Sequence, residues 1–216
     1  MNNGPLLFLG FFLAIAFSWT GIVVTNLVQQ TQAGGTQPYF DPASESVVPM
    51  PMSGSARQGQ LVYQDLGCVY CHSQQVRNSL SRDPAAESPD VARGWGSRGN
   101  VARDYIFDGR LFLGTMRTGP DLRNVGQRLP IATWHLNHLY NPQSTSAGSI
   151  MPPYPFLFDV REVKGEPSPN ALSLPPEFAP PPGYEVVPNK RGEALVAYLL
   201  SLRTDYELPE APGGGQ

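Results

Sequence analysis

The sequence predicts a mostly α-helical fold with long irregular loops, anchored by one transmembrane helix at the N-terminus. Three observations support this fold class. Residues 5–28 are apolar and carry no charged side chain. Residues 130–140 and 190–203 place apolar side chains three and four positions apart, which is the period of an α-helix. Finally, 23 prolines and 22 glycines among 216 residues exceed ordinary use and indicate long stretches without regular structure.

Residues 5–28 are long enough to cross a lipid bilayer. At about 1.5 Å of rise per residue, such a helix spans the roughly 30 Å of hydrocarbon with modest tilt. The alternative is a cleaved signal peptide with Ala14-Ile15-Ala16 as its small-residue site. Signal peptides begin with a positively charged region, whereas the first basic residue here is Arg57. We therefore expect an uncleaved anchor, preceded by a short N-terminus of residues 1–4.

Residues 29–56 are expected to form a linker between the anchor and the main domain. Gly, Pro, Ser and Gln dominate this segment, and neither a helical nor a strand period is visible. The domain itself is expected over residues 57–205, followed by a flexible tail over 206–216. It opens with a helix over 57–67, in which Gly59 would allow a second helix to approach closely.

That second helix is expected over residues 190–203, with Asn189 as its N-cap. Its apolar stripe consists of Leu195, Tyr198, Leu199 and Leu202. A third helix is expected over 130–140. Pro130 suits its first turn, and Asn141 precedes a proline and so disfavours a continuation of the helix.

Residues 152–188 contain eleven prolines. Proline cannot donate a backbone hydrogen bond and favours extended polyproline structure over helix. Because a loop of this length in a compact domain is usually functional, we expect an arm that lies against a neighbouring subunit.

The most informative motif is Cys68-Val69-Tyr70-Cys71-His72. A Cys-x-x-Cys-His run is the attachment site of a c-type haem. Two thiols three positions apart lie on one face of a helical turn, so each sulfur can bond to one vinyl group of the porphyrin. The adjacent His72 can then present its imidazole to the iron. The run uses both cysteines of the chain.

Three other interpretations of the cysteine pair are weaker. A thioredoxin-like site would need alternating strands and helices, which the sequence does not show. A disulfide across three positions would close too small a loop to stabilise the fold much. A zinc site could combine the pair with His135 and His138, but these histidines lie more than sixty residues away, far outside zinc-finger spacing.

A six-coordinate electron-transfer haem needs a ligand on the side opposite His72. Thioether sulfur is a soft ligand that raises the reduction potential, whereas a second histidine lowers it by comparison. The candidates are Met50, Met52, Met116, Met151, His135 and His138. Met151 is favoured, because the prolines that follow it would hold its loop rigid. The simplest interpretation of the two histidines is that they are ordinary helix residues, and contact with a haem propionate is the alternative.

Two further features bear on the site. The turn Thr118-Gly119-Pro120-Asp121-Leu122 can offer a carbonyl to the second ring nitrogen of His72, although it can also be a simple Gly-Pro turn. Nine arginines lie from Arg77 to Arg128, with acidic residues among them. An ion-paired surface is the simpler interpretation of these arginines, and binding of haem propionates or of a partner is the alternative.

Together, CVYCHSQQVR, WGS, RTGPDL, WHLNHL and SIMPPYPF resemble the membrane-anchored mono-haem cytochrome c subunit, or subunit II, of cbb-type haem–copper oxidases. The resemblance covers the anchor and residues 57 to about 158. It implies one covalent haem c held by Cys68 and Cys71, His72 and Met151 as axial ligands, and the turn at Pro120 beside the histidine.

The resemblance also implies a function. The subunit would relay electrons from a soluble cytochrome c or a further cytochrome c subunit to the O₂-reducing haem–copper subunit, without catalysing a reaction itself. It would sit in the bacterial inner membrane with its haem domain on the periplasmic side and residues 1–4 inside. The alternatives are the mono-haem subunit of nitric oxide reductase, a free-standing anchored carrier and a thiol oxidoreductase. The net charge of −3 gives no indication of nucleic-acid binding.

Overall fold

The computed structural model describes residues 3–32, 35, 37–42, 44–79 and 88–211. The α-helices are α1 (Gly4–Trp19), α2 (Thr25–Gln32), α3 (Gly54–Asp65), α4 (Pro89–Ala92), α5 (Val125–Arg128), α6 (Ala132–Tyr140) and α7 (Lys190–Ser201). The strands are β1 (Tyr39–Asp41), β2 (Ser46–Val48), β3 (Phe158–Glu162) and β4 (Tyr184–Pro188). Short π or 3₁₀ turns are η1 (Thr20–Val24), η2 (Cys68–Tyr70), η3 (Ala102–Tyr105), η4 (Pro142–Ser144) and η5 (Pro155–Leu157). This mostly helical, loop-rich architecture confirms the predicted fold class.

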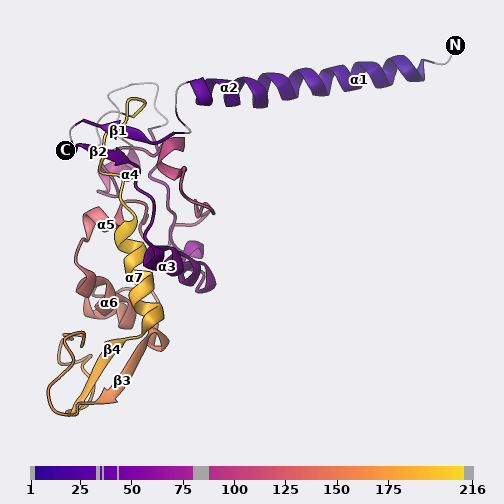
Figure 1. Ribbon diagram of the computed structural model, residues 1–216. Helices are drawn as coiled ribbons and strands as arrows, with labels where there is room; N and C mark the ends of the chain where they lie inside the picture. Colours follow the sequence, from indigo (N-terminus) through magenta and orange to yellow (C-terminus); the bar gives the residue numbers. More distant parts are fainter. Residues whose placement is uncertain (1–2, 33–34, 36, 43, 80–87, 212–216) are drawn as a thin grey trace.

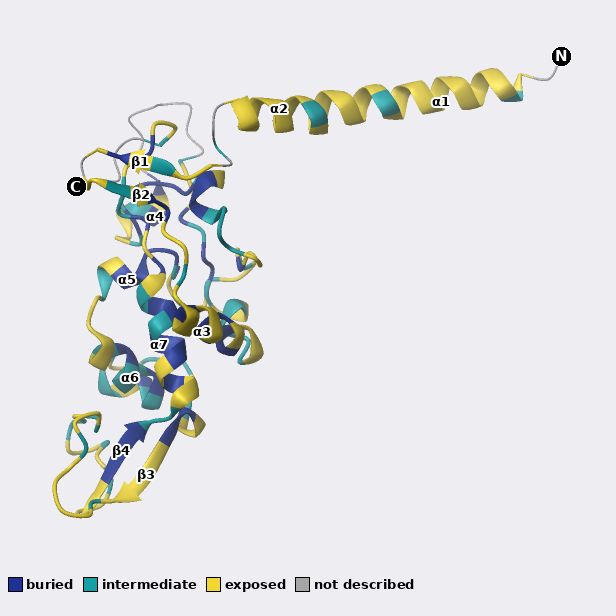
Figure 2. Cartoon of the chain, in the orientation of Figure 1, coloured by how far each residue is buried: buried dark blue, intermediate teal, exposed yellow. Residues whose placement is uncertain are grey.

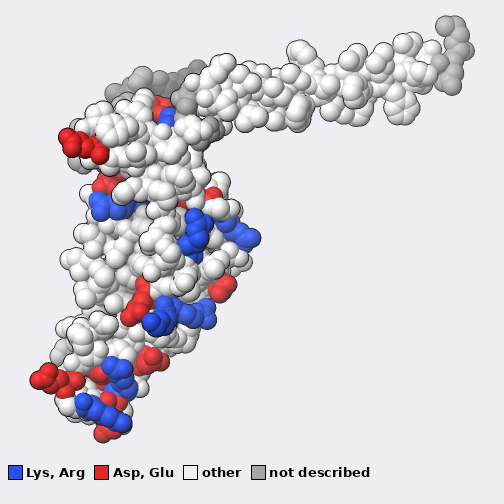
Figure 3. All heavy atoms as spheres, in the orientation of Figure 1, with Lys and Arg blue, Asp and Glu red and all other residues white. Residues whose placement is uncertain are grey.

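The first helix is continuous from Gly4 to Gln32 through the π-turn η1 and extends away from the rest of the molecule (Figure 1). Its 29 residues are long and apolar enough to cross a membrane, and none of its apolar window is buried within the protein. The helix is exposed on all sides and carries no charged side chain (Figures 2 and 3). It continues to Gln32, beyond the expected end at residue 28, because Gln and Thr side chains outside the apolar stretch do not stop a helix.

The linker is more ordered than expected. Strands β1 and β2 pair antiparallel, with Tyr39 opposite Val48, and the side chains of Asp41 and Val48 are buried. Strands of three residues are too short to show a period in the sequence, which explains why this hairpin was not predicted. Residues 33, 34, 36 and 43 of the linker lie outside the described residues.

Helices α3 and α7 pack against each other and form the centre of the core (Figure 1). A Cβ atom on Gly59 would lie 1.8 Å from the carbonyl oxygen of Ala194, so only glycine allows the two backbones to come this close. The expected close approach of these helices is therefore confirmed. Asn189 caps α7 as predicted, because its side-chain oxygen accepts hydrogen bonds from the backbone of Arg191 and Gly192.

Helix α6 begins at Ala132, two positions after Pro130, and ends at Tyr140 as predicted. The core that these helices share is built from Val62, Tyr63, Leu139, Leu195, Tyr198, Leu199 and Leu202.

The proline-rich segment 152–188 is not simply an extended arm. Its two ends pair as an antiparallel hairpin, β3 with β4, which lies at the end of the body opposite the membrane helix (Figure 1). Leu172 and Leu174, from the connection between the strands, pack back onto the core of the same chain. Ten of the eleven prolines lie outside the paired residues, and Pro188 is the last residue of β4, so none interrupts the middle of the strand ladder.

Ion pairs in which at least one partner is buried hold the irregular region that follows residue 72. They are Arg77–Asp90, Arg117–Asp90, Arg98–Asp104, Arg103–Glu210 and Arg123–Asp108. The ion-paired interpretation of the arginines is thus correct for these residues, whereas Arg82 lies outside the described residues.

The first part of the expected flexible tail is also held in place. The Tyr206 hydroxyl donates to Asp104 at 2.8 Å, Arg103 pairs with Glu210 at 2.6 Å, and Leu208 is buried. The domain therefore continues to at least residue 211, while residues 212–216 lie outside the described part of the chain.

Candidate cofactor-binding site

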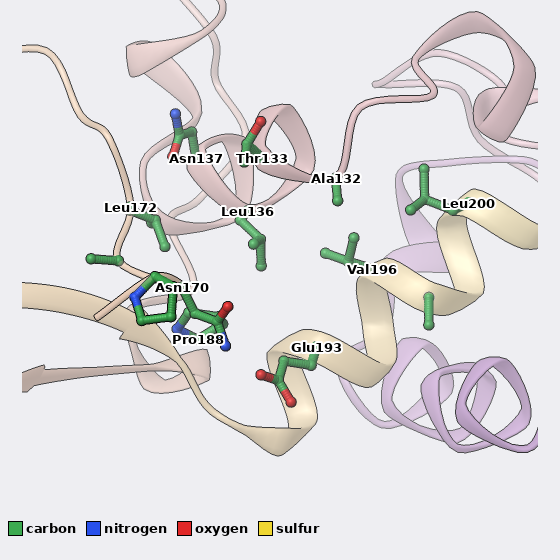
Figure 4. Close-up of a pocket in the computed structure, with 13 residues that line it drawn as sticks. Ala132, Thr133, Leu136, Asn137, Asn170, Leu172, Pro188, Glu193, Val196 and Leu200 are labelled. Atoms are coloured by element: carbon green, nitrogen blue, oxygen red, sulfur yellow. The ribbon is translucent and has the colours of Figure 1, made fainter. Parts of the chain in front are cut away.

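The structure contains two cavities that are candidate cofactor sites. One, of about 380 Å³, lies between α6, α7 and the connection from β3 to β4. Its walls are mostly aliphatic, with Leu136, Leu172, Val196 and Leu200 facing the space and Glu193 as its one ionisable residue (Figure 4). No residue predicted to bind a cofactor lines it, so we do not assign the site there.

The other cavity, of about 470 Å³, falls within the size range of cofactor pockets. It is lined by all five residues that the sequence predicts for the site, namely Cys68, Cys71, His72, Pro120 and Met151. The remaining walls are largely apolar and come from α3, α5, α6, α7 and the loops 118–122 and 146–154. The fold thus brings together, around one cavity, residues that are more than eighty positions apart in the chain.

The two cysteines lie in the turn that follows α3. Gly67 connects helix and turn with a positive φ of 69°, which glycine adopts without strain. The backbone N–H of Cys71 and of His72 both donate to the carbonyl of Cys68, at 3.2 and 3.0 Å. The resulting turn places both sulfurs, which are not bonded to each other, at the cavity.

The ring of His72 has a fixed tautomer. Its Nδ1–H donates to the carbonyl oxygen of Pro120 at 2.7 Å, and a carbonyl can only accept. Nε2 therefore keeps its lone pair and can ligate a metal. Burial lowers the pKa of His72, which favours this neutral form, although the Pro120 carbonyl acts in the opposite direction.

Gly119 shapes the space around the same ring. A Cβ atom at this position would lie 2.2 Å from Cε1 of His72 and 2.8 Å from Nε2. The absence of a side chain therefore lets the Gly-Pro turn close over the imidazole. A backbone hydrogen bond of 2.9 Å from Gly119 N–H to the Cys71 carbonyl ties the two segments together.

Asp121 anchors this turn from behind. Its carboxylate is fully buried and accepts hydrogen bonds from the Ser73 hydroxyl at 2.5 Å and from the Gln75 backbone at 2.7 Å. These bonds hold the segment after His72 in a fixed position relative to the segment after Pro120. Neither Gly119 nor Asp121 was assigned a role from sequence, because turn residues carry no periodic signal.

Met151 lines the cavity and also packs against the core. The other methionine candidates do not reach the space: Met50 and Met116 are 72% and 59% exposed, and Met52 contacts the core outside it. Among the sulfur candidates, Met151 alone combines cavity lining with a short, proline-flanked loop.

His135 and His138 line the cavity as well, and each has a hydrogen-bond partner. Nε2–H of His135 donates to the Leu129 carbonyl at 2.8 Å. Nδ1 of His138 shares a hydrogen bond of 2.6 Å with the Thr145 hydroxyl, and its ring stacks on Trp134 with centroids 4.7 Å apart. Burial lowers the pKa of His138 to about 4, with His72 and His135 acting in the same direction, so this ring is neutral at pH 7.

Arg128, at the end of α5, is the one permanently charged side chain among the residues that line this cavity. From the sequence alone, Arg128 could not be distinguished from the eight other arginines between Arg77 and Arg128. Only its position at the cavity, apart from the ion-paired arginines, makes it stand out.

The weaker interpretations of the cysteines gain no support. Among the described residues, no group of three or more His, Cys, Asp or Glu could hold a metal ion, which argues against the zinc site. Burial raises the pKa of the Cys68 thiol to about 11, whereas thiol oxidoreductases lower the pKa of the attacking thiol.

Comparison with known proteins gives one family. Residues 26–173 match the family described as cytochrome c oxidase, mono-heme subunit/FixO. The match covers more than half of the chain and includes every predicted site residue together with Arg128. No curated protein matches the chain closely enough to count as a relative.

Proposed function

Because the chain belongs to the family of mono-haem subunits of cytochrome c oxidase, we propose that it relays single electrons to an oxidase's haem–copper subunit through one covalent haem c. The observation that carries the proposal is the cavity in which Cys68, Cys71, His72 and Met151 meet. The oxidase assignment favours this partner over the nitric oxide reductase alternative.

The residues present fit a haem. The tautomer of His72 directs a free lone pair away from Pro120, and Gly119 leaves room above the ring that any Cβ would fill. The apolar lining suits a porphyrin, and two sulfurs lie at the edge of the same space. Cys68 and Cys71 would attach the porphyrin, and His72 and Met151 would ligate the iron.

The iron supplies the one-electron chemistry, and the chain's residues tune and position it. The Pro120 carbonyl keeps the His72 ring oriented and increases its basicity as a ligand. A thioether from Met151 favours the reduced state and so raises the potential. The apolar walls exclude water. This favours the less charged, reduced state of the site and therefore also raises the reduction potential.

The N-terminal helix is proposed to anchor the chain in the bacterial inner membrane, with the haem domain on the periplasmic side. Its length and composition support a membrane span. Charged residues do not report the sidedness, because no Lys or Arg lies near either end of the helix. The sidedness instead rests on covalent haem attachment, as the family resemblance implies. The electron donor would be a soluble cytochrome c or a further cytochrome c subunit.

The substitution Met151→Leu tests the proposal in the purified complex, with Met116→Leu as the matched control on an exposed methionine. We expect M151L to keep haem bound on a denaturing gel but to lose the methionine–iron charge-transfer band. Its potential should fall by roughly 0.1 V or more, because axial ligands set haem potentials over a range of about 0.8 V. Electron delivery to the oxidase should slow accordingly.

M116L should behave as wild type in all three measurements. A wild-type band and potential in M151L would remove Met151 as a ligand. A wild-type protein without gel-stable haem would remove the whole proposal.

A further inference from the structure

We propose that Arg128 binds a propionate of the haem through a charge-assisted hydrogen bond. The inference rests on the proposed function, since it requires a haem in the cavity. It adds a residue that neither the sequence motif nor the family match assigns.

The position of Arg128 carries the first part of the argument. It ends α5, directly after the segment that holds His72, and it lines the cavity beside Leu129. Arg128 lines the same cavity as His72 and His135. A cation is unexpected in a mostly apolar cavity, because burying an unpaired charge is costly.

Arg128 uses only some of its hydrogen-bond donors within the described part of the protein. One Nη2–H donates to the backbone carbonyl of Asp121 at 2.6 Å. Its Nε–H is buried and has no acceptor among the described residues. A guanidinium has five N–H donors, and neither N–H of Nη1 has an acceptor among the described residues, so Nη1 is the group that can donate to a carboxylate in the cavity.

Arg128 also differs from the other buried arginines in its electrostatics. Arg98, Arg103 and Arg123 each pair with a carboxylate within 3 Å. No carboxylate of the described residues lies within ion-pair distance of Arg128. Burial lowers the pKa of Arg128, and the more distant Asp121 offsets this only in part.

The missing counter-ion matches the chemistry of the proposed cofactor. A haem carries two propionates, which are the only anionic groups it brings into such a cavity. A carboxylate beside Nη1 of Arg128 would accept a hydrogen bond from it and neutralise the charge of the guanidinium. The arginine thus fixes one edge of the porphyrin, while the cysteines fix another.

The experiment uses the holo-complex with three variants: Arg128→Gln, Arg128→Lys and the control Arg191→Gln. Arg191 is an exposed arginine of α7 that pairs with Asp65 at 3.6 Å and does not line the cavity. The measurements are gel-stable haem, the charge-transfer band of the methionine ligand, the reduction potential, and the oxidised-minus-reduced infrared spectrum of the propionate carboxylates.

We expect R128Q to lower the potential and to shift a propionate carboxylate band, because removing a nearby positive charge favours the oxidised haem. R128K should retain most of the potential but not the band position, since an ammonium keeps the charge and loses the planar fork. R191Q should match wild type. If R128Q fails to accumulate, R128K still tests whether the infrared band of the propionate carboxylate shifts.

A wild-type potential and unshifted carboxylate bands in R128Q, with haem attached, would overturn the assignment of Arg128. Absence of gel-stable haem from the wild type would instead overturn the proposed function. The two failures are therefore distinguishable.

Discussion

In the irregular segment after residue 72, which supports the site, hydrogen bonds and ion pairs of single side chains hold the chain in place of helices and strands. Asp90 is an example, because its buried carboxylate accepts hydrogen bonds from Arg77 at 2.8 to 3.1 Å and from Arg117 at 2.7 Å. Arg117 in turn donates to Ser73, the residue next to His72, at 2.7 Å. A charge network thus extends from a distant loop to the neighbour of the proposed ligand.

Replacement of Asp90 should reveal this network through its pH dependence. Burial alone would raise the pKa of Asp90, but its arginine partners outweigh it and lower the pKa from 3.8 to about 2. The carboxylate therefore stabilises the fold fully above about pH 4, and this contribution is lost as the pH falls towards 2. We expect Asp90→Asn to cost about 2 kcal/mol at pH 7, a value reduced for the exposed side of Arg77.

The measurement is denaturant unfolding of the solubilised protein at pH 7, 4 and 2.5. Asp205→Asn, which disrupts an exposed pair with Arg203, is the control and should cost less than about 1 kcal/mol. A destabilisation by D90N that stays constant down to pH 2.5 would show that the charge is not the cause.

At the scale of elements, the crossing of α3 and α7 determines where the site forms. Helix α3 leads directly into the Cys68 turn, and α7 contributes Leu195 and Leu199 to the cavity wall. Tyr63 of α3 and Tyr198 of α7 meet edge to face with centroids 5.4 Å apart. The Tyr198 hydroxyl then donates to the side chain of Gln74 at 2.9 Å. Any displacement of the crossing should therefore displace the cofactor site.

Gly59→Ala tests that dependence, because the new Cβ would overlap the backbone of Ala194, which cannot move aside alone. We expect a loss of about 1–3 kcal/mol in stability from overpacking, together with reduced haem content. Gly54→Ala at the start of the same helix is the matched control, since nothing lies within 4 Å of its Cβ. Thermal unfolding and haem absorbance per protein provide the measurement. Equal stability and haem content in the two variants would contradict the proposed role of the crossing.

At the scale of the whole molecule, the membrane helix and the β3–β4 hairpin lie at opposite ends of the haem domain (Figure 1). By the register of the pair, one face of the hairpin carries Phe158, Val160 and Glu162 from β3 and Tyr184, Val186 and Pro188 from β4. Phe158 and Val186 are buried on the core, whereas Val160 and Tyr184 are 54% and 48% exposed beyond it. The apolar face thus continues past the body of the chain, which is where a neighbouring subunit of the oxidase could pack.

The double substitution Val160→Thr and Tyr184→Thr tests this contact. Threonine retains strand propensity, so the hairpin should persist while its apolar surface is lost. We expect less of the chain to co-purify with the oxidase in mild detergent, with an unchanged haem spectrum. Asp159→Asn on the opposite face is the control. Full co-purification of the double variant would exclude this face as an interface.

Much of the fold could be predicted because its signals are local. The apolar anchor, the stripe of α7 with its Asn189 cap, and the end of α6 before Pro142 each follow from neighbouring residues. The strands, by contrast, depend on pairing partners: β3 and β4 join residues 158–162 with 184–188, and the intervening prolines hid this pairing. The packed residues 206–211 were missed for the same reason, since they are held by Arg103 and Asp104.

The sequence by itself indicated the proposed chemistry of the site, because Cys68, Cys71 and His72 have the spacing of a haem-attachment motif. It also determined the anchor, because twenty-four residues without charge are unfavourable in water and stable in lipid. Only the tertiary structure decided which methionine reaches the cavity, that Gly119 must lack a side chain, and that Arg128 has no carboxylate partner among the described residues. Those properties depend on distances between residues far apart in the chain, which packing sets and no local pattern encodes.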